Sequence, residues 1–212
     1  MNKNRTLRQA LSDYIPDAAV DMVAEWFNKY PVILKITRTR LTKLGDFRGA
    51  PVGKPSSISV NHNLNKYSFL VTLLHEMAHA VVHFNYSHRT APHGKAWKLA
   101  YKQVASPYLL NEIFPNDILI AYTDYLINPQ ATSTSNLPLA QALRNYDNRT
   151  EEVTVSMLSP ETIFALHDGR MFRIVTKLRK RYRCYCLSTK KTYLFSPMAI
   201  VKPIESLKNT AS

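Results

Sequence analysis

Hydrophobic residues recur at helical spacing over residues 7–30, and β-branched residues dominate 32–40 and 57–60. The first pattern predicts one or two helices, because apolar side chains three and four positions apart share one helix face. The other two stretches predict strands, and the glycines and prolines between them predict a loop or hairpin. The N-terminal part of the chain therefore combines helices with a small sheet.

A longer apolar pattern follows these strands. It predicts a long helix over about 66–86 and, after a loop, another helix over about 94–105. Residues 107–126 contain two prolines and several aromatic residues, which indicates a short pair of helices. Residues 127–150 are rich in Asn, Pro, Thr and Ser, so we interpret them as a linker.

Short β-rich runs separated by turn residues occupy the chain after residue 151. They are typical of a small all-β domain, and with the preceding helices they predict an α+β protein. We expect a first domain over 1–126, a linker over 127–150 and a basic β domain over 151–212. The β-rich runs are 152–157, 162–166, 171–177, 181–187, 192–195 and 199–203.

The helix predicted over 66–86 is apolar on every side except one. At about 100° per residue, the polar side chains between residues 68 and 83 fall in one narrow arc, whereas apolar residues fill the other positions of this stretch. We therefore expect this helix to be buried on its apolar sides. We call the arc the polar stripe; it contains Ser68, Thr72, His75, Glu76, His79 and His83.

Glu76 is the member of the polar stripe that most needs a charged partner. No Lys or Arg occurs between Lys66 and Arg89, and a buried unpaired carboxylate is energetically costly. His75 and His79 belong to the pattern His-Glu-x-x-His and lie about one helical turn apart, so both imidazoles can reach one metal ion. The pattern predicts one zinc ion on these histidines, with Glu76 beside it as general base.

A catalytic zinc site needs a third protein ligand and one position left for water. His83 lies on the same stripe, but ligands at i, i+4 and i+8 would span about 12 Å of helix axis, too far for one ion. His88 and His93 lie beyond the helix, where the chain can turn back, and both remain candidates. A position at the start of the next helix would hold His93 more firmly, which favours it over His88.

Composition places the chain among ordinary soluble proteins. Of its 212 residues, 45% are hydrophobic and 20% charged, and no apolar run approaches the roughly 18 residues of a membrane helix. No apolar segment follows the basic N-terminal residues, so we expect no secretory signal. Two cysteines cannot form a disulfide framework, which fits a reducing compartment. We expect a cytoplasmic protein without membrane contacts.

The net charge of +13 is unevenly distributed along the chain. Residues 1–110 carry 15 basic and 6 acidic side chains, residues 111–150 carry 2 and 4, and residues 151–212 carry 11 and 5. A positive field attracts polyanions such as nucleic acid. The densest basic run lies within 177–183, and we call its members the hairpin cations: Lys177, Arg179, Lys180, Arg181 and Arg183.

Tyrosines accompany the hairpin cations, at Tyr182, Tyr185 and Tyr193. Arg and Lys can hold phosphates while tyrosine rings stack on unpaired bases, so the run predicts nucleic-acid binding. A charged edge strand that resists aggregation would show the same pattern of cations. The sequence leaves both interpretations open.

The motif HEMAHA begins at His75, and thirteen residues separate His79 from His93, which begins the motif HGKAWK. These two motifs resemble the signature of the SprT-like zinc metalloproteases, and the stretches 37–41 and 57–61 are similar to that family as well. The resemblance covers roughly residues 10–105. It implies a minimal zincin fold, zinc ligands at His75, His79 and His93, and a general base at Glu76.

The resemblance also implies a zinc endopeptidase that acts on protein substrates. Spartan-type members cleave proteins bound or crosslinked to DNA, so DNA, single-stranded or in protein complexes, becomes a candidate partner. Two other interpretations are a nucleic-acid-binding protein with a structural zinc site and little turnover, and a non-proteolytic zinc hydrolase. The presence of Glu76 favours an enzyme, because a structural site does not need a general base.

The C-terminal part departs from the pattern of many family members, which carry a zinc ribbon built from paired cysteine motifs. The only cysteines are Cys184 and Cys186, too few for a tetrahedral structural site. On a strand both side chains point to one face, so we interpret them as small apolar residues of a β core. The β domain would then stand in place of the ribbon without zinc.

Overall fold

The computed structural model of the 212-residue chain describes residues 6–40, 43–51, 53–86, 90–132, 136–147 and 152–204. The chain divides into two compact units, residues 1–148 and 149–212, and each has its own hydrophobic core. No helix within the described ranges is long and apolar enough to cross a membrane. Helices and a small sheet form the first unit and strands form the second, which confirms the predicted α+β class.

A mixed three-stranded sheet lies at the centre of the first unit. Its strand order is β1-β3-β2, with β1 parallel and β2 antiparallel to β3, so β2 is an edge strand. The segment that the sequence predicts as a loop or hairpin contains β2, which pairs with β3, the second predicted strand. The strands are β1 (Val32–Thr37), β2 (Gly45–Arg48) and β3 (Ser56–Asn61), preceded by helices α1 (Leu7–Leu11) and α2 (Asp17–Lys29).

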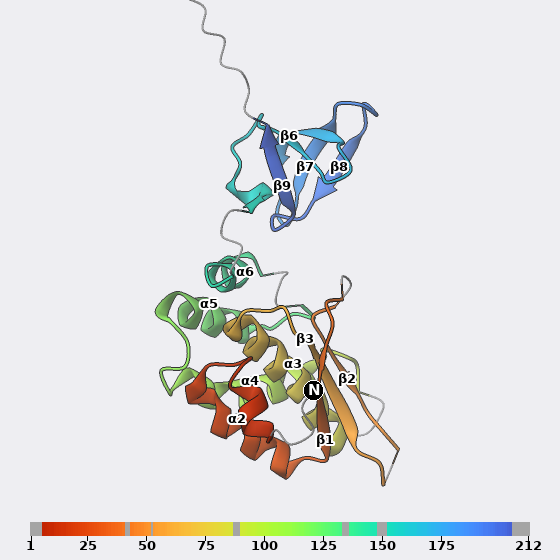
Figure 1. The fold of residues 1–212 in the computed structure, drawn as a ribbon. Helices are drawn as coiled ribbons and strands as arrows, with labels where there is room; N and C mark the ends of the chain where they lie inside the picture. The colour runs from red at the N-terminus through yellow and green to blue at the C-terminus, as the bar shows by residue number, and fades with distance from the viewer. Residues whose placement is uncertain are drawn as a thin grey trace, which may run out of the picture. The chain divides into compact units, whose positions relative to one another are not determined.

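Helix α3 (Lys66–Asn85) carries the polar stripe and lies between the sheet and α4 (Figure 1). It begins at Asn65, whose side chain accepts hydrogen bonds from the backbone N–H groups of Tyr67 and Ser68 at 3.1 and 2.9 Å. All residues from Phe69 to Ala78 are buried. The prediction of a helix packed on its apolar sides is therefore confirmed.

Helix α4 (Lys95–Leu109) is longer than its apolar pattern predicts, because it continues through Pro107. Proline has no N–H to donate to the carbonyl oxygen of Gln103, four residues earlier. That oxygen instead accepts a hydrogen bond from the Ser106 hydroxyl at 3.4 Å. Since Pro107 stands in the last turn, the helix loses little by including it.

Helix α6 (Leu137–Arg144) lies inside the segment 127–150 that its composition indicates as linker. Two of the residues that suggested a linker, Asn136 and Pro138, belong to the start of this helix. Asn136 caps α6 by accepting from the backbone N–H of Leu139 at 3.0 Å, and Pro138 stands in the first turn. The helix packs against α5 (Asn116–Ile127) and contributes to the first core.

The second unit is a six-stranded antiparallel sheet with strand order β4-β9-β5-β6-β7-β8. Side chains alternate along β6 and β7, so that one face of these strands is buried and the other exposed. The predicted β-rich runs all contain strands, although the first is only two residues long before a 3-10 turn. The strands are β4 (Val153–Thr154), β5 (Ile163–Ala165), β6 (Met171–Lys177), β7 (Tyr182–Cys186), β8 (Thr192–Phe195) and β9 (Ile200–Ile204).

Candidate metal centre

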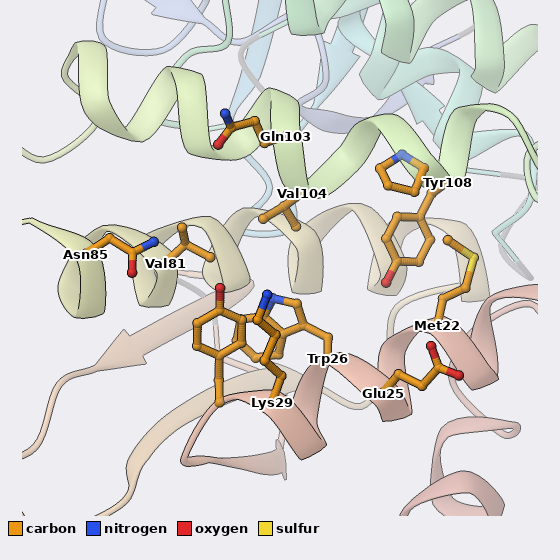
Figure 2. A pocket seen from close by; sticks show the side chains of 11 residues that line it. Met22, Glu25, Trp26, Lys29, Val81, Asn85, Gln103, Val104 and Tyr108 are labelled. Atoms are coloured by element: carbon orange, nitrogen blue, oxygen red, sulfur yellow. The ribbon is translucent and has the colours of Figure 1, made fainter.

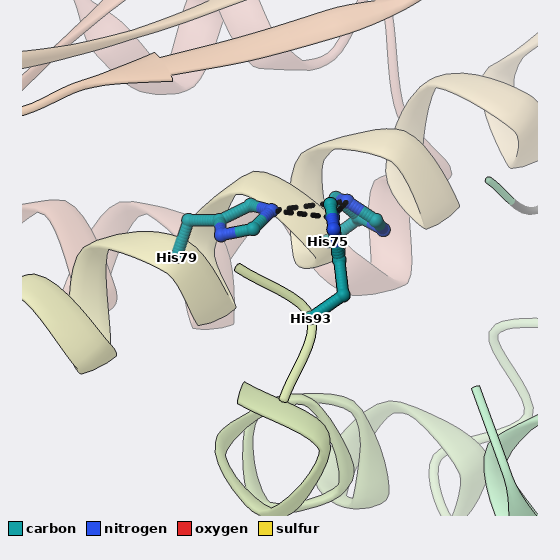
Figure 3. Close-up of side chains that lie close together, drawn as sticks. All are labelled: His75, His79 and His93. Carbon is teal, nitrogen blue, oxygen red and sulfur yellow. Dashed lines mark hydrogen bonds between the residues drawn. The ribbon is translucent and has the colours of Figure 1, made fainter. Parts of the chain in front are cut away.

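Three histidine side chains converge between α3 and the start of α4 (Figure 3). His75 and His79 come from adjacent turns of α3, and their Nε2 atoms are 3.2 Å apart. The Nε2 atom of His93 lies 3.2 Å from that of His75 and 3.0 Å from that of His79. The structure thus brings together the three histidines that the sequence motifs single out.

The backbone of His93 turns its side chain back toward α3. Its φ angle of 58° lies in the left-handed region, which non-glycine residues seldom adopt. The next residue, Gly94, is the N-cap of α4, so the chain passes from this turn directly into the helix. The start of α4 fixes His93, as expected from its position in the sequence.

The spacing of the three Nε2 atoms fits a metal ion better than it fits hydrogen bonds. A neutral imidazole nitrogen either donates or accepts, so three mutually adjacent nitrogens cannot all be paired with one another. In a tetrahedral site with Zn–N bonds of about 2.0–2.1 Å, neighbouring ligand nitrogens lie roughly 3.3–3.4 Å apart. The observed distances of 3.0–3.2 Å are close to this value, and the cluster could hold a metal ion.

Burial keeps the histidine cluster in the neutral form that binds metals. Desolvation, with the neighbouring imidazoles adding to it, lowers the pKa of His75 to about 3 and that of His79 to about 4. Burial also lowers the pKa of His93. At neutral pH all three rings therefore carry a free lone pair, as metal ligands require.

Trp97, from the first turn of α4, forms the wall of the cluster. Its ring centroid lies 4.7 Å from that of His75, 5.4 Å from that of His79 and 4.6 Å from that of His93. The side chain is only 1% exposed, so it shields the imidazoles from solvent on that side. The sequence motif contains Trp97 but does not show this role, because the contact depends on how α3 and α4 pack.

Glu76 lies beside the histidines and beneath the edge strand β2. Its side chain is buried, at 7% exposure. A Cβ atom on Gly45 would lie 2.7 Å from Glu76 Oε1, so this close approach requires glycine. The backbone N–H of Phe47 acts on the Glu76 carboxyl group to lower its pKa. Strand β2 thus covers the carboxylate and fixes its position.

Charged residues next to β2 modify the acidity of Glu76. Burial, together with repulsion from Asp46, raises the pKa of Glu76 to about 7, although Arg40 and Lys43 act in the opposite direction. Sequence inspection missed these neighbours because it searched for cations only along the helix. Gly45, in β2, and Gly49, just after it, both lie against side chains of α3, and such glycines could have indicated the close approach of another element.

His83, the last member of the polar stripe, does not join the histidine cluster. Its ring lies 5.4 Å from the ring of Phe47, and a Cβ on Gly49 would clash with it at 2.5 Å. The expectation that His83 is not a third ligand therefore agrees with its position. His88, the other candidate, lies outside the described residues.

All five hairpin cations are exposed on the β6–β7 hairpin of the second unit. Tyr182, in contrast, faces the core at 7% exposure, and the ring of Tyr193 packs 5.5 Å from that of Phe172. The expectation that Tyr182 is available to stack on a base is therefore wrong, because the alternation of β7 turns it inward. Of the three tyrosines, Tyr185 has its ring on the outer face of the strand.

Cys184 and Cys186 are fully buried free thiols in the second core. Both point to the inner face of β7, as the i, i+2 spacing predicts. The interpretation of the two cysteines as apolar core residues is confirmed.

A cavity of about 490 Å³ lies between α2, α3 and α4 (Figure 2). Trp26, Val104 and Tyr108 supply apolar surface, and Glu25 and Lys29 add charge. The lining residues on α3 fall on the side opposite the polar stripe, since each residue advances the helix by about 100°. The cavity is therefore separate from the histidine cluster.

Residues 23–117 of the chain match the SprT-like family. The chain carries a SprT-like family domain. This domain contains the histidine cluster and Glu76, and the predicted family resemblance is confirmed. The hairpin cations lie outside the SprT-like domain. No match to the chain is found among curated proteins or solved structures.

Proposed function

We propose that the SprT-like domain is a zinc endopeptidase, in which His75, His79 and His93 hold one zinc ion and Glu76 is the general base. The observation that carries the proposal is the convergence of three neutral imidazoles next to a buried carboxylate. Three protein ligands leave a fourth position for water or substrate, which is the composition of a catalytic zinc site. A structural zinc site would not need the carboxylate.

Bound zinc would polarise the scissile carbonyl and lower the pKa of water toward about 7. Glu76 accepts the proton of the attacking water and then delivers a proton to the leaving amine. Its carboxylate is held for this role beneath β2, where Gly45 lies against Oε1. Trp97 keeps solvent away from the histidine side of the site.

The edge strand β2 supplies a surface for an extended peptide. Within the described residues, β2 pairs only with β3, and its other edge faces away from the sheet. A peptide backbone can add to such an edge as a further strand. Since β2 also covers Glu76, a peptide bound there would bring its backbone close to the general base.

A zinc-dependence assay tests the proposed activity. We expect the full chain to cleave unfolded casein only when zinc is present, and to stop when a chelator removes the metal. Restoring zinc to the metal-free protein should restore cleavage, and parallel reactions with single-stranded DNA would show any activation. Equal cleavage by metal-free protein, or none by fully zinc-loaded protein with and without DNA, would reject the proposal.

We also propose that the hairpin cations bind nucleic-acid phosphates. In residues 152–204, the carboxylates of Glu161 and Asp168 pair with Arg173 and Arg170 at 2.9 and 2.7 Å. None of the hairpin cations has an ion pair with a described carboxylate. Because Tyr182 is buried, the expected interaction is with the backbone of the nucleic acid and depends little on its base sequence.

A salt titration tests this phosphate interaction. Replacing the turn residues Arg179, Lys180 and Arg181 by alanine should lower the slope of log K against log salt by about 2–3 for duplex DNA, since each phosphate contact contributes about 0.9. The fluorescence anisotropy of a labelled duplex measures the binding constant at each salt concentration. As control, a triple alanine variant at Lys29, Lys54 and Lys202 removes the same charge elsewhere. Equal slopes for the two variants would contradict a site on the hairpin.

A further inference from the structure

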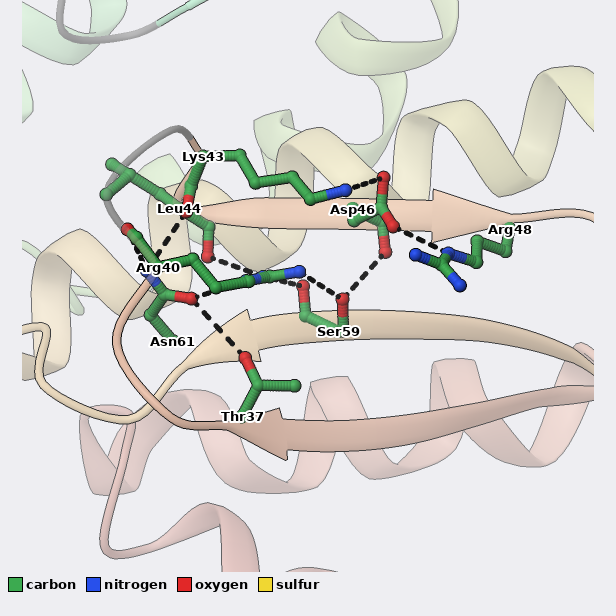
Figure 4. A network of polar contacts seen from close by, with 8 residues as sticks. All are labelled: Thr37, Arg40, Lys43, Leu44, Asp46, Arg48, Ser59 and Asn61. Carbon is green, nitrogen blue, oxygen red and sulfur yellow. Dashed lines mark hydrogen bonds and ion pairs between the residues drawn. The ribbon is translucent and has the colours of Figure 1, made fainter.

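The connection between β1 and β2 is held to β3 by a side-chain network centred on Arg40 and Asn61 (Figure 4). The Arg40 guanidinium donates to the Asn61 side-chain oxygen at 2.8 Å and to the Ser59 hydroxyl at 3.1 Å. It also donates to the backbone carbonyls of Leu44 and Ser59, both at 3.4 Å. One arginine thus contacts both β3 and the residue that precedes β2.

Asn61 also binds residues of this connection. Its side-chain amide donates to the carbonyl oxygens of Arg40 and Lys43 at 3.2 and 3.0 Å, and its backbone N–H donates to Leu44 at 2.9 Å. The Thr37 hydroxyl also lies 3.3 Å from the side-chain oxygen of Asn61. Asn61 is 1% exposed, so each of these bonds is protected from water.

The network reaches β2 by two routes. Leu44, bound by both Arg40 and Asn61, immediately precedes Gly45, the residue packed against Glu76 Oε1. The Ser59 hydroxyl, which accepts from Arg40, lies 3.4 Å from the carbonyl oxygen of Asp46 and donates to it. Both routes end at residues next to Gly45, whose backbone lies against the Glu76 carboxylate.

An edge strand of four residues makes few backbone hydrogen bonds, so these bonds alone fix its position over the neighbouring helix only weakly. β2 pairs with β3 over four residues only, Gly45–Arg48. The guanidinium fork offers several donors in one rigid plane, which suits it to fixing the start of this strand. A lysine could supply the charge but not the simultaneous bonds to Asn61 and Ser59.

We propose that Arg40 and Asn61 are positioning residues that set β2 over α3 and thereby orient Glu76. The proposal rests on the proposed peptidase function for its kinetic consequence, whereas its structural consequence can be measured without any turnover. Neither residue contacts the histidine cluster in the contacts given above, so metal binding should not depend on them.

Hydrogen exchange of metal-free protein tests the structural part. In Arg40→Ala and Asn61→Ala, we expect the amides of β2 to exchange about 10- to 100-fold faster than in wild type, because the strand opens locally. Amides in the buried middle of α3 should keep wild-type protection. Arg48→Ala is the matched control: Arg48 lies on β2, is exposed, and within the described residues its side chain bonds only the Asp46 carboxylate, so exchange should not change.

Kinetics of the zinc-loaded variants test the catalytic part. We expect kcat to fall about 10- to 100-fold in Arg40→Ala and Arg40→Lys, as for a misplaced catalytic group. Zinc affinity should stay within about threefold of wild type, because neither Arg40 nor Asn61 contacts the histidine cluster in the bonds given above. Millimolar guanidinium should restore part of kcat to Arg40→Ala but not to Arg40→Lys, where the lysine side chain occupies the site. A general loss of stability would not respond in this way.

The outcomes separate this proposal from the proposed function. If wild type does not hydrolyse peptides, the peptidase fails, and the exchange of β2 still decides whether Arg40 and Asn61 fix the strand. Unchanged exchange of β2 in both alanine variants would overturn the positioning role. So would full kcat in Arg40→Lys with wild-type zinc content. If Arg40→Ala does not fold, Arg40→Lys and Asn61→Ala carry both tests.

Discussion

Glu76→Gln should abolish peptide hydrolysis while leaving zinc bound. Glutamine has nearly the same shape, so it fits beneath Gly45. It cannot take a proton from water, and general-base catalysis contributes about 10²- to 10⁴-fold. We expect a loss of this size in kcat/KM for casein or a fluorogenic peptide.

Zinc content measured on the same Glu76→Gln sample makes the result specific. One zinc per chain in both wild type and variant would show that the histidine cluster is intact. Glu25→Gln, an identical change at an exposed position on α2, should leave both activity and zinc content unchanged. Wild-type turnover by Glu76→Gln at full zinc occupancy would exclude the general-base role.

His93→Ala should remove most of the bound zinc. Two imidazoles from one helix would remain, and His93 supplies the nitrogen that completes the triangle at 3.0 and 3.2 Å. Loss of a residue that merely orients a ligand costs 10- to 100-fold in affinity, so loss of the ligand itself should cost about 100-fold or more. Competition with a chromophoric chelator measures the dissociation constant.

The stability of the protein offers a second readout of the same change. Saturating zinc should raise the melting temperature of wild type, because a ligand that binds only the folded state stabilises it. His93→Ala should lose most of this increase, whereas His83→Ala, on the same stripe but outside the cluster, should retain it. Full zinc occupancy in His93→Ala would instead point to His88 as third ligand.

Helices α1, α2 and α3 and strands β1 and β3 of the first unit follow from local patterns. Helix α3 was predictable to within one residue at its C-terminal end, because its apolar positions and its cap at Asn65 are local signals. Helix α6 was not predictable in this way, because Asn136 and Pro138 are common both in linkers and at the start of a helix. Only the packing of Leu139 and Leu143 into the first core shows that this segment is a helix and not a linker.

In the candidate site, too, some residues could be placed from local sequence patterns and others only from the tertiary structure. The i, i+4 spacing places His75 and His79 on adjacent turns of one helix whatever surrounds them. The choice of His93 over His88 from the residues alone stayed open, because it depends on how the chain returns after α3. The left-handed turn at His93 and the packing of α4 place its imidazole beside the other two.

By itself, the amino-acid sequence determined the buried helix, its single polar stripe and the pairing of two histidines with a glutamate, because helical periodicity depends only on residue order. Tertiary structure decided which residues surround them: Trp97 behind the histidines, β2 above Glu76, and Arg40 with Asn61 at the start of β2. These contacts join residues far apart in the chain, where spacing carries no information about distance. They arise only when the sheet and α4 pack against α3.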